Sequence, residues 1–228
     1  MPYSVGQMEE HRAFKDRTYS EFARIGQALA SEKRLELIDL LAQGPRHVEA
    51  IAQETGMSVA SVSQHLQVLR DARLVDMQRQ GTRSVYRLAG TDILKLWLSL
   101  RGVAEERLAE VRRIVDDLAH NGPESEELLR ADLEALLASG KAILLDVRPR
   151  LEYEAGHLPS AISIPIGELA DRIAELPRDR EIVTYCRGAY CLFADEAVTL
   201  LREHGFKARR LEGGWPEWLS EGRSVSAP

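Results

Sequence analysis

The chain has 228 residues, of which 44% are hydrophobic and 29% are charged, the usual balance of a protein that folds around an apolar core. With 16 glycines, 9 prolines and 2 cysteines, the composition excludes a disordered chain, a collagen and a disulfide scaffold. The apolar runs, such as 142–145, are far shorter than the roughly 20 residues that a membrane-spanning helix needs, and the N-terminus lacks the features of a signal peptide. We therefore expect a cytoplasmic protein with reduced thiols and no membrane partner.

The net charge of −6 is unevenly distributed along the chain. Residues 1–120 contain 17 basic and 17 acidic residues, whereas residues 121–228 contain 13 basic and 19 acidic residues. A strong turn signal, Asn121-Gly122-Pro123, separates the two parts. We therefore predict two domains, residues 1–121 and residues 122–228.

The first part is predicted to be mainly helical. Apolar residues recur at helical spacing in four segments, which are residues 8–29, 32–42, 47–54 and 58–69. Ser31 and Ser58 stand at the expected N-caps of the second and fourth segments. The last two segments are joined by a turn that contains Gly56, and the second of them is polar on its outer face. This is a helix-turn-helix pattern.

A β-hairpin is predicted next, with strands at 74–79 and 83–88 and Gly81 at its tip. Arg79 and Arg83 on this hairpin suit DNA phosphates or a minor groove. The preceding helix offers short donors and acceptors that suit base edges in a major groove, namely Ser61, Ser63, Gln64 and His65. The alternatives are an ordinary helical domain with a solvated polar face and, for His65, partial packing beside the core.

The stretch "SVASVSQHLQVLRDARLV", followed by "RQGTRSVYRL", closely resembles the ArsR family of winged-helix repressors, and the resemblance covers about residues 10–120. It implies a dimeric repressor that binds double-stranded operator DNA through the same helix and hairpin residues. Many ArsR relatives sense metals through cysteines in the first helix of the motif or through Asp and His residues on the last helix. Here residues 47–55 contain no cysteine and His120 is the only histidine of the last helix, so we expect no metal at either place.

Residues 91–120 show apolar positions every three or four residues and are predicted to form one long helix. At about 1.5 Å per residue, that helix would be roughly 45 Å long. One compact domain does not easily cover so long an apolar stripe, so we expect this helix to form a homodimer, which also suits reading two half-sites of DNA. The alternative is packing against its own chain.

The second part alternates apolar strands and helices, which favours an α/β fold with a parallel sheet. Strands are predicted at 142–146, 182–185 and 207–211, and helices at 125–139, 168–175 and 190–203. In such sheets the functional groups gather at the carboxyl ends of the strands, and Cys186 stands directly after one of them. The following loop precedes a helix, and inward-facing amides there would form an anion cradle that lowers the thiol pKa and favours an accessible thiolate. The alternative is a buried, inert cysteine.

Three further segments, "LLDVRPRLEYEAGHLPSAISIP", "IVTYCRGAYC" and "LEGGWPEWL", resemble the rhodanese family of sulfurtransferases over about residues 125–225. The resemblance implies that Cys186 accepts a sulfane sulfur as a persulfide, while Arg187 and the backbone of Gly188, Ala189, Tyr190 and Cys191 hold the anionic donor. Asp146, Arg148 and His157 match family landmarks, which we interpret as support for the loop.

The chain departs from active rhodaneses at two positions of the loop. Ala189 stands where a glycine is common, and Cys191 stands where an arginine is common, which argues against efficient thiosulfate turnover. Cys191 instead suits a resolving thiol that attacks sulfur on Cys186, either directly or through inserted sulfur atoms that would select sulfane sulfur over peroxide. A direct bond needs Cα atoms roughly 4.4–6.8 Å apart. The alternative is that Cys191 packs in the first turn of the helix.

The sequence therefore predicts a homodimeric repressor that senses reactive sulfane sulfur or thiol redox state through Cys186 and Cys191, with no cofactor. The expected sulfur donor is a polysulfide, a persulfide or thiosulfate. One alternative is a sulfurtransferase that carries a DNA-binding domain. Others are a sensor in which the two thiols bind trivalent arsenic or a soft metal ion, and an inert partner-binding module.

Overall fold

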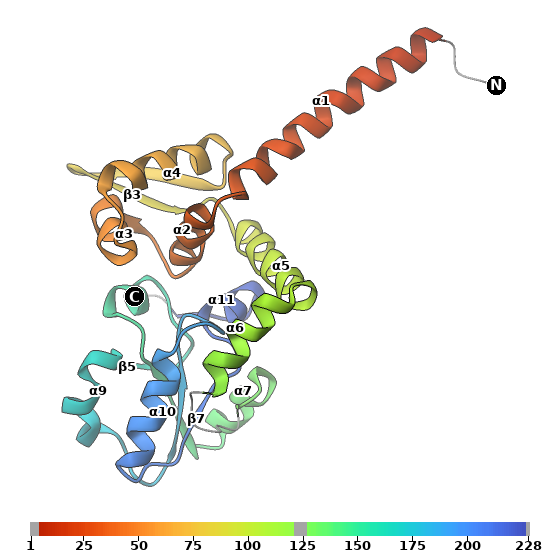
Figure 1. Cartoon of the computed structure of the whole chain (residues 1–228). Coiled ribbons are helices and arrows are strands. Elements are labelled where there is room, and N and C mark those ends of the chain that lie inside the picture. The colour runs from red at the N-terminus through yellow and green to blue at the C-terminus, as the bar shows by residue number, and fades with distance from the viewer. Residues whose placement is uncertain (1–4, 121–126, 227–228) are drawn as a thin grey trace. The chain divides into compact units, whose positions relative to one another are not determined.

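The computed structural model describes residues 5–120 and 127–226, and it divides the chain into two compact units, Met1–Ile93 and Leu94–Pro228 (Figure 1). The domain boundary predicted after residue 121 lies outside the described residues and stays a prediction. Within the described residues, no helix is both long and apolar enough to span a bilayer.

The first unit contains the predicted helix-turn-helix and hairpin. Its helices are α1 (Val5–Leu29), α2 (Glu32–Ala42), α3 (Val48–Thr55) and α4 (Val59–Asp71). Its strands are β1 (Arg46–His47), β2 (Val75–Gln80) and β3 (Arg83–Leu88), which pair antiparallel in the order β1-β3-β2. The winged helix-turn-helix fold is thereby confirmed, and the short strand β1 is an addition that the sequence pattern did not predict.

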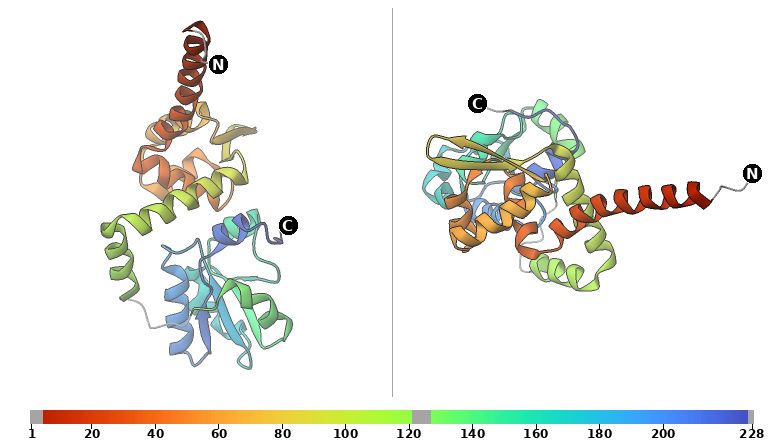
Figure 2. Two further views of the ribbon diagram at one scale, coloured as in Figure 1. Left: turned by 90° about the vertical axis from the view of Figure 1, so that its right-hand side faces the viewer. Right: turned by 90° about the horizontal axis from the view of Figure 1, so that it is seen from above.

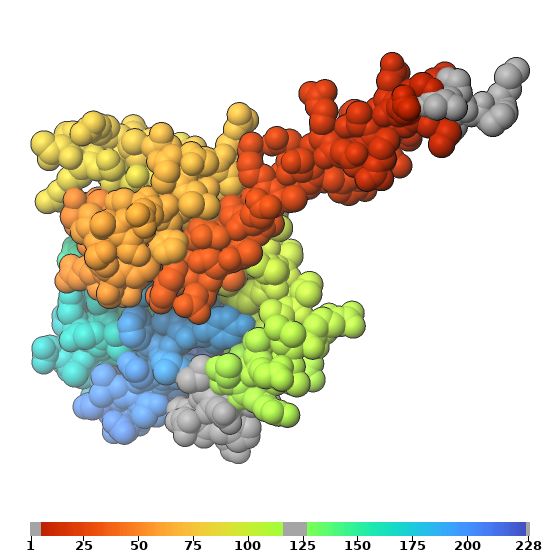
Figure 3. All heavy atoms as spheres, turned by 45° about the horizontal axis from the view of Figure 1, so that its top comes forward, coloured from red at the N-terminus to blue at the C-terminus, as the bar shows by residue number. Residues whose placement is uncertain are grey.

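Helix caps and a small apolar core fix this unit. The Ser58 hydroxyl accepts a hydrogen bond from the Ser61 amide at 3.2 Å, so Ser58 caps α4 as predicted. Ser31 stands at the N-cap of α2, but its side chain makes no capping hydrogen bond. Side chains from α2, α3 and α4 bury the core, among them Leu37, Ile38, Ile51, Val62, Leu66 and Leu69. Helix α1 extends beyond this core, and its side chains are largely exposed (Figure 3).

The single helix predicted over 91–120 is wrong, because the structure divides it into α5 (Thr91–Arg107) and α6 (Ala109–His120) at Leu108. The Arg112 guanidinium donates to the Glu106 carbonyl at 3.1 Å, which gives this carbonyl a partner other than the next turn of a continuing helix. The Leu108 carbonyl then accepts the amides of Val111 and Arg112 and starts α6. The side chain of His120 is outside the described part of the structure.

The rest of the second unit is built on a parallel sheet, as predicted. Its strands are β4 (Ala142–Asp146), β5 (Ile162–Ser163), β6 (Glu181–Tyr185) and β7 (Ala208–Arg210), in the order β5-β4-β6-β7. The helical elements are α7 (Arg130–Ala138), α8 (Arg150–Ala155), α9 (Ile166–Arg172), η1 (Ile173–Glu175), α10 (Phe193–Glu203) and α11 (Trp215–Ser220). The helix predicted from residue 125 starts later, since Leu128 pairs with Leu211 as an extension of the sheet.

Both faces of this sheet are covered, which explains the continuous apolar runs of its central strands (Figure 2). Neighbouring residues of a strand point to opposite faces. Leu145 and Ile182 pack on one side with residues of α9 and α10, while Leu144 and Val183 pack on the other side with residues of α7 and α11. The carboxyl ends of β4 and β6 are thereby held side by side, where Asp146 and Tyr185 pair in register.

Candidate functional site at the carboxyl end of strand β6

Cys186 directly follows β6, and the chain then runs through a short loop to Cys191 and helix α10. In the structure the two cysteines form a disulfide bond, with their Cα atoms 6.3 Å apart. This separation lies within the roughly 4.4–6.8 Å that a disulfide requires. The two sulfur atoms therefore meet directly, and no inserted sulfur atom is needed to bridge them.

The two cysteines differ in their exposure. Cys186 is 1% exposed and packs in the apolar cluster that includes Leu145, Val147 and Ala194. Cys191 is half-buried at the edge of the same cluster. The expected accessible thiol at position 186 is therefore not present in the bonded form, because Cys191 and the cluster cover that sulfur.

The two cysteines and the residues between them form a loop, residues 186–191, which we call the cysteine loop. Several contacts fix the path of its backbone. Gly188 has a φ of 122°, a conformation that residues with a Cβ rarely adopt. The Cys191 amide donates to the Gly188 carbonyl at 3.1 Å, and the Trp215 amide donates to the Cys186 carbonyl at 3.1 Å. A Cβ on Gly214 would collide with the backbone of the cysteine loop, so only glycine allows this close approach.

Arg187, expected to hold the anionic donor, is paired with a carboxylate of the same chain. Its guanidinium makes hydrogen bonds of 2.9 and 3.1 Å from Nε to the Glu152 carboxylate, and Nη2 adds a further bond. The Glu152 side chain is fully buried. The charge of Arg187 is therefore balanced within the fold, and its role in anion binding stays a prediction, as do the roles of Gly188, Ala189 and Tyr190.

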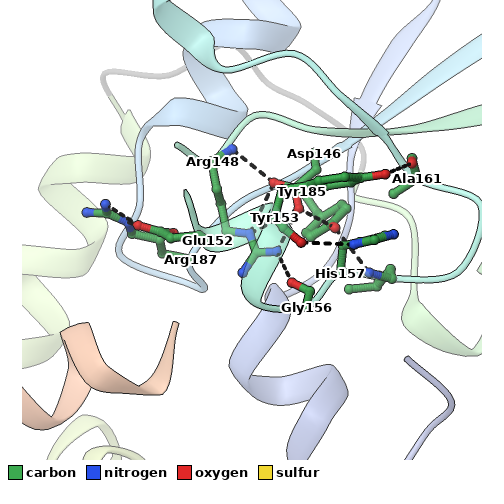
Figure 4. A network of polar contacts seen from close by, with 10 residues as sticks. Asp146, Arg148, Glu152, Tyr153, Gly156, His157, Ala161, Tyr185 and Arg187 are labelled. Carbon is green, nitrogen blue, oxygen red and sulfur yellow. Dashed lines mark hydrogen bonds and ion pairs between the residues drawn. The ribbon is translucent and has the colours of Figure 1, made fainter. Parts of the chain in front are cut away.

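A buried polar network lies at the carboxyl ends of β4 and β6, where the cysteine loop begins (Figure 4). Arg148 and Asp146 form an ion pair at 2.6 Å, and both side chains are fully buried. Arg148 also donates to the Gly156 carbonyl at 2.8 Å, and the Tyr185 hydroxyl donates to the Asp146 carboxylate. Burial, together with the Asp146 charge, raises the pKa of Tyr185 well above its usual value, so this hydroxyl stays neutral. These contacts hold the ends of β4 and β6 together.

His157 belongs to the same region but makes ordinary structural contacts. Its ring stacks on Tyr153 at 3.7 Å between centroids, and its Nδ1 lies 2.9 Å from the Tyr153 carbonyl oxygen. Its backbone pairs with Ser226 in an antiparallel bridge. Asp146 and Arg148 belong to the network that joins the ends of β4 and β6, and the supporting role of all three residues for the cysteine loop stays a prediction.

The predicted DNA-reading side chains lie on one side of α4. Ser63 and Gln64 are exposed, whereas Ser61 and His65 are half-buried. Val62 and Leu66 on the opposite side are fully buried in the core. Half-burial of His65 fits the alternative of partial packing, and its contact with a base stays a prediction.

The two hairpin arginines point to opposite faces of the ribbon formed by β2 and β3. Arg79 is paired in register with Ser84, and Gln80 is paired with Arg83, so successive pairs alternate between the two faces. Both arginines are exposed. A hairpin tip with a cation on each face is suited to a minor groove, which has a phosphate backbone along each of its walls.

Two acidic residues at the cysteine loop were not predicted from the sequence. Glu152 holds Arg187, and Glu217 lies against Gly188, where an added Cβ would be 3.2 Å from its carboxylate oxygens. For Glu217, the sequence offered one signal, since this acidic residue stands within the otherwise apolar segment "WPEWL". The partners of these residues are distant in the chain, so the sequence alone did not identify them.

The chain matches two family models on either side of residue 121. Residues 31–77 match the model of the bacterial regulatory protein arsR family, and residues 129–221 match that of the rhodanese-like domain. The chain is 46% identical over 221 residues to the HTH-type transcriptional regulator Rv0324 of Mycobacterium tuberculosis, covering 97% of this chain and 95% of that protein. The chain belongs to the ArsR family. It is an ArsR-family transcriptional regulator that carries a rhodanese-like domain.

Other similarities cover one part of this ArsR-family chain each. It is 30% identical over 125 residues to the tRNA uridine(34) hydroxylase of Cronobacter sakazakii, which covers 50% of this chain and only 34% of that protein. It is also similar to the solution structure of the homodimeric winged helix-turn-helix DNA-binding domain Mb0332 from Mycobacterium bovis. That similarity has 42% identity and a TM-score of 0.41, and it covers 47% of this chain and 94% of that chain.

Proposed function

We propose that this ArsR-family regulator is a repressor that responds to reactive sulfane sulfur, or to oxidation of its thiols, by forming the bond between Cys186 and Cys191. The observation that carries the proposal is the direct bond between these two cysteines at the carboxyl end of β6. Cys191 also lies two residues before α10, whose N-terminal end favours a negative charge on a nearby thiolate.

The reaction with a persulfide donor, RS–SH, has two steps. The Cys186 thiolate attacks the outer sulfur of the donor, which forms Cys186–S–SH and releases the thiolate RS⁻. The Cys191 thiolate then attacks the Sγ of Cys186, which forms the Cys186–Cys191 bond and releases hydrosulfide, HS⁻. The cysteine pair loses two electrons, and the sulfane sulfur gains them as sulfide. A peroxide reaches the same bond through a sulfenic acid.

Sensing fits the cysteine loop better than catalytic sulfur transfer does. Cys191 occupies the position of the arginine that is common in active rhodaneses, and the cation that remains, Arg187, is engaged by Glu152. A persulfide on Cys186 therefore has a thiol nearby that resolves it. Trivalent arsenic is disfavoured because two thiolates are few for a tight site.

We further propose that the regulator binds double-stranded operator DNA as a homodimer through α4 and the β2–β3 hairpin. Exposed apolar side chains support the dimer, because they recur along single helices without being covered by the described chain. On α5, on α6 and at the break between them they are Leu96, Leu100, Val103, Ile114 and Leu108, and on α1 they are Met8, Phe14, Tyr19 and Phe22. A second copy of the chain that covers these helices would place two copies of α4 on successive half-sites.

The experiment combines intact-mass analysis with operator titration before and after treatment with a polysulfide. We expect wild type to lose two hydrogens without retaining sulfur, and to lose about 5- to 150-fold in operator affinity, the usual range of coupling between two sites. Cys186→Ser should show no change in affinity on treatment. Cys191→Ser should retain one added sulfur on Cys186, because it lacks the resolving thiol.

Other outcomes separate the alternatives. Rapid, repeated transfer of sulfur to cyanide without an effect on operator affinity would support a sulfurtransferase and contradict the proposal. Release from DNA by trivalent arsenic, but not by polysulfide, would support the metalloid sensor. A response to hydrogen peroxide of the same size as the response to polysulfide would identify oxidation in general as the signal. If Cys186→Ser behaves as wild type in every assay, the rhodanese-like domain is an inert module.

A further inference from the structure

Helix α5 contacts the cysteine loop through two charged side chains. Arg101 of α5 forms an ion pair with Glu217 of α11, and both side chains are only 12% exposed. Arg101 also lies 3.4 Å from the carboxylate of Glu105, one turn further along α5. All three residues belong to the second compact unit, which begins at Leu94.

Glu217 joins this ion pair to the backbone of the cysteine loop. Its carboxylate accepts a hydrogen bond from the Gly214 amide at 2.8 Å. Gly214 is in turn pressed against the backbone of Cys186 and Gly188. A Cβ added to Gly188 would lie 3.2 Å from both carboxylate oxygens of Glu217, so this carboxylate borders the loop at Gly188. A change in the path of the cysteine loop at Gly188 would therefore displace the carboxylate that holds Arg101.

Tyr190 provides a second contact between the cysteine loop and α5. Tyr190 directly precedes Cys191, and its hydroxyl donates a hydrogen bond to the Glu105 carboxylate. The Arg101 guanidinium lies over the Tyr190 ring, 5.3 Å from its centroid. Arg101 and Glu105 on one face of α5 therefore both contact Tyr190 of the cysteine loop, and Arg101 also contacts Glu217 of α11, which packs against that loop.

We propose that the Arg101–Glu217 ion pair and the Tyr190–Glu105 hydrogen bond transmit the state of the Cys186–Cys191 bond to helix α5. This inference rests on the proposed function, since it names the route by which the sensing loop acts. Opening the bond releases Cys191 from Cys186, and Tyr190 is the adjacent residue. The contacts of Tyr190 and Glu217 with α5 are therefore expected to differ between the two states.

The ion pair is suited to this role because its energy depends strongly on geometry. Removing one partner of a largely buried pair leaves the other charge uncompensated, so the pair favours one arrangement of the cysteine loop over others. The nearby carboxylates outweigh burial and hold the pKa of Arg101 above its usual value, so its charge persists throughout the physiological range.

Helix α5 is also placed so that altered contacts with Tyr190 and Glu217 affect the DNA-binding elements. It begins three residues after β3, the second strand of the hairpin. Its exposed apolar side chains Leu96, Leu100 and Val103 lie on the side opposite Arg101 and Glu105, given about 3.6 residues per turn. One face of α5 therefore contacts the cysteine loop, while the other is left for a second copy of the chain.

The test compares operator affinity and mass change in Arg101→Gln and Glu105→Gln, using full-length protein and a polysulfide. We expect both variants to form the Cys186–Cys191 bond as wild type does, and to bind the operator normally before treatment. After treatment, their affinity should change by less than about 2-fold, whereas that of wild type changes by about 5-fold or more. A purely structural role for these residues would lower the thermal stability but would leave this ratio unchanged.

Matched controls are available on the same helix. Arg107 and Glu106 form an exposed pair, with side chains 73% and 67% exposed, so Arg107→Gln and Glu106→Gln should respond as wild type does. If Arg101→Gln does not fold, Glu105→Gln still tests the second contact. An unchanged response in variants that fold and form the bond would overturn the inference, as would a failure of the variants to form the bond at all. A wild type that forms the bond without a change in operator affinity would instead overturn the proposed function.

Discussion

Cys186 and Cys191 occupy different environments, which gives them different chemical roles. In the bonded form Cys186 is buried in the apolar cluster, whereas Cys191 is half-buried at the edge of the loop. A reducing thiol must reach one of the two sulfur atoms along the line of their bond, and the more exposed sulfur is the one that it reaches. Reduction is therefore expected to begin at Cys191 and to leave Cys186 as the released thiolate.

The ion pair of Asp146 and Arg148 leads to a prediction on stability. Asp146→Asn should lower the free energy of unfolding by about 3–5 kcal/mol, because it leaves the fully buried Arg148 without its charge partner. Urea unfolding measures this difference. Glu154→Gln is the control, since Glu154 forms an exposed pair with Arg150 and its loss should change the free energy by less than about 1 kcal/mol. Equal stability of the two variants would contradict the assignment of the buried pair as the support of the cysteine loop.

Much of the cysteine loop could be predicted at the level of single residues, and its partners could not. The position of Cys186 after a buried strand predicted its place at the carboxyl end of the parallel strands, and its spacing from Cys191 made a direct bond one of the expected possibilities. The pairing of Arg187 with Glu152 joins residues 35 positions apart, and that of Arg101 with Glu217 joins residues 116 positions apart. Periodicity in a sequence reports which residues share a face of one element, and it carries no information on such distant pairs.

At the level of elements, the sequence predicted the type of most helices and strands, but the helices predicted from residues 8, 125 and 190 start at Val5, Arg130 and Phe193. Residues 32–42 and 142–146 were predicted with the bounds that the structure shows. The elements that the sequence did not predict are short ones, such as β5 and α11, because two to six residues contain too little periodicity to identify a strand or a helix. The break at Leu108 was also missed, since the apolar pattern continues across it and a side chain, Arg112, supplies the alternative hydrogen bond.

Helix α4 and the β2–β3 hairpin lead to a prediction on DNA binding. Gln64→Ala should relax the preference for one base pair of the operator by about 1–3 kcal/mol, because an exposed amide on α4 suits the edge of a base. Arg83→Ala should weaken binding to all sequences and reduce the slope of log affinity against log salt by about 1, as loss of one phosphate contact does. Titrations over a series of salt concentrations and operator variants measure both quantities. An equal loss of base preference in both variants would contradict the separate roles of helix and hairpin.

At the level of the whole molecule, two domains of different families are joined in one chain, and the proposed function requires that their states depend on each other. Such coupling is reciprocal, since an effect of the cysteine bond on DNA affinity implies an equal effect of DNA on the formation of the bond. The distribution of charge along the chain fits this division, because the acidic excess lies entirely in residues 121–228 and the segment with the helix-turn-helix and hairpin has none. The DNA-binding part is then free of the repulsion that a net negative charge would exert on phosphates.

Whether the Cys186–Cys191 bond controls operator binding is decided by comparing the two redox forms of the protein. The protein is prepared in two forms, fully reduced and fully bonded, with mass spectrometry confirming the loss of two hydrogens in the second form. Both forms are then titrated with the same operator in the absence of any sulfur donor. We expect the bonded form to bind at least about 5-fold more weakly than the reduced form, and the difference to disappear in Cys186→Ser. Identical affinities of the reduced and bonded wild type would contradict this expectation.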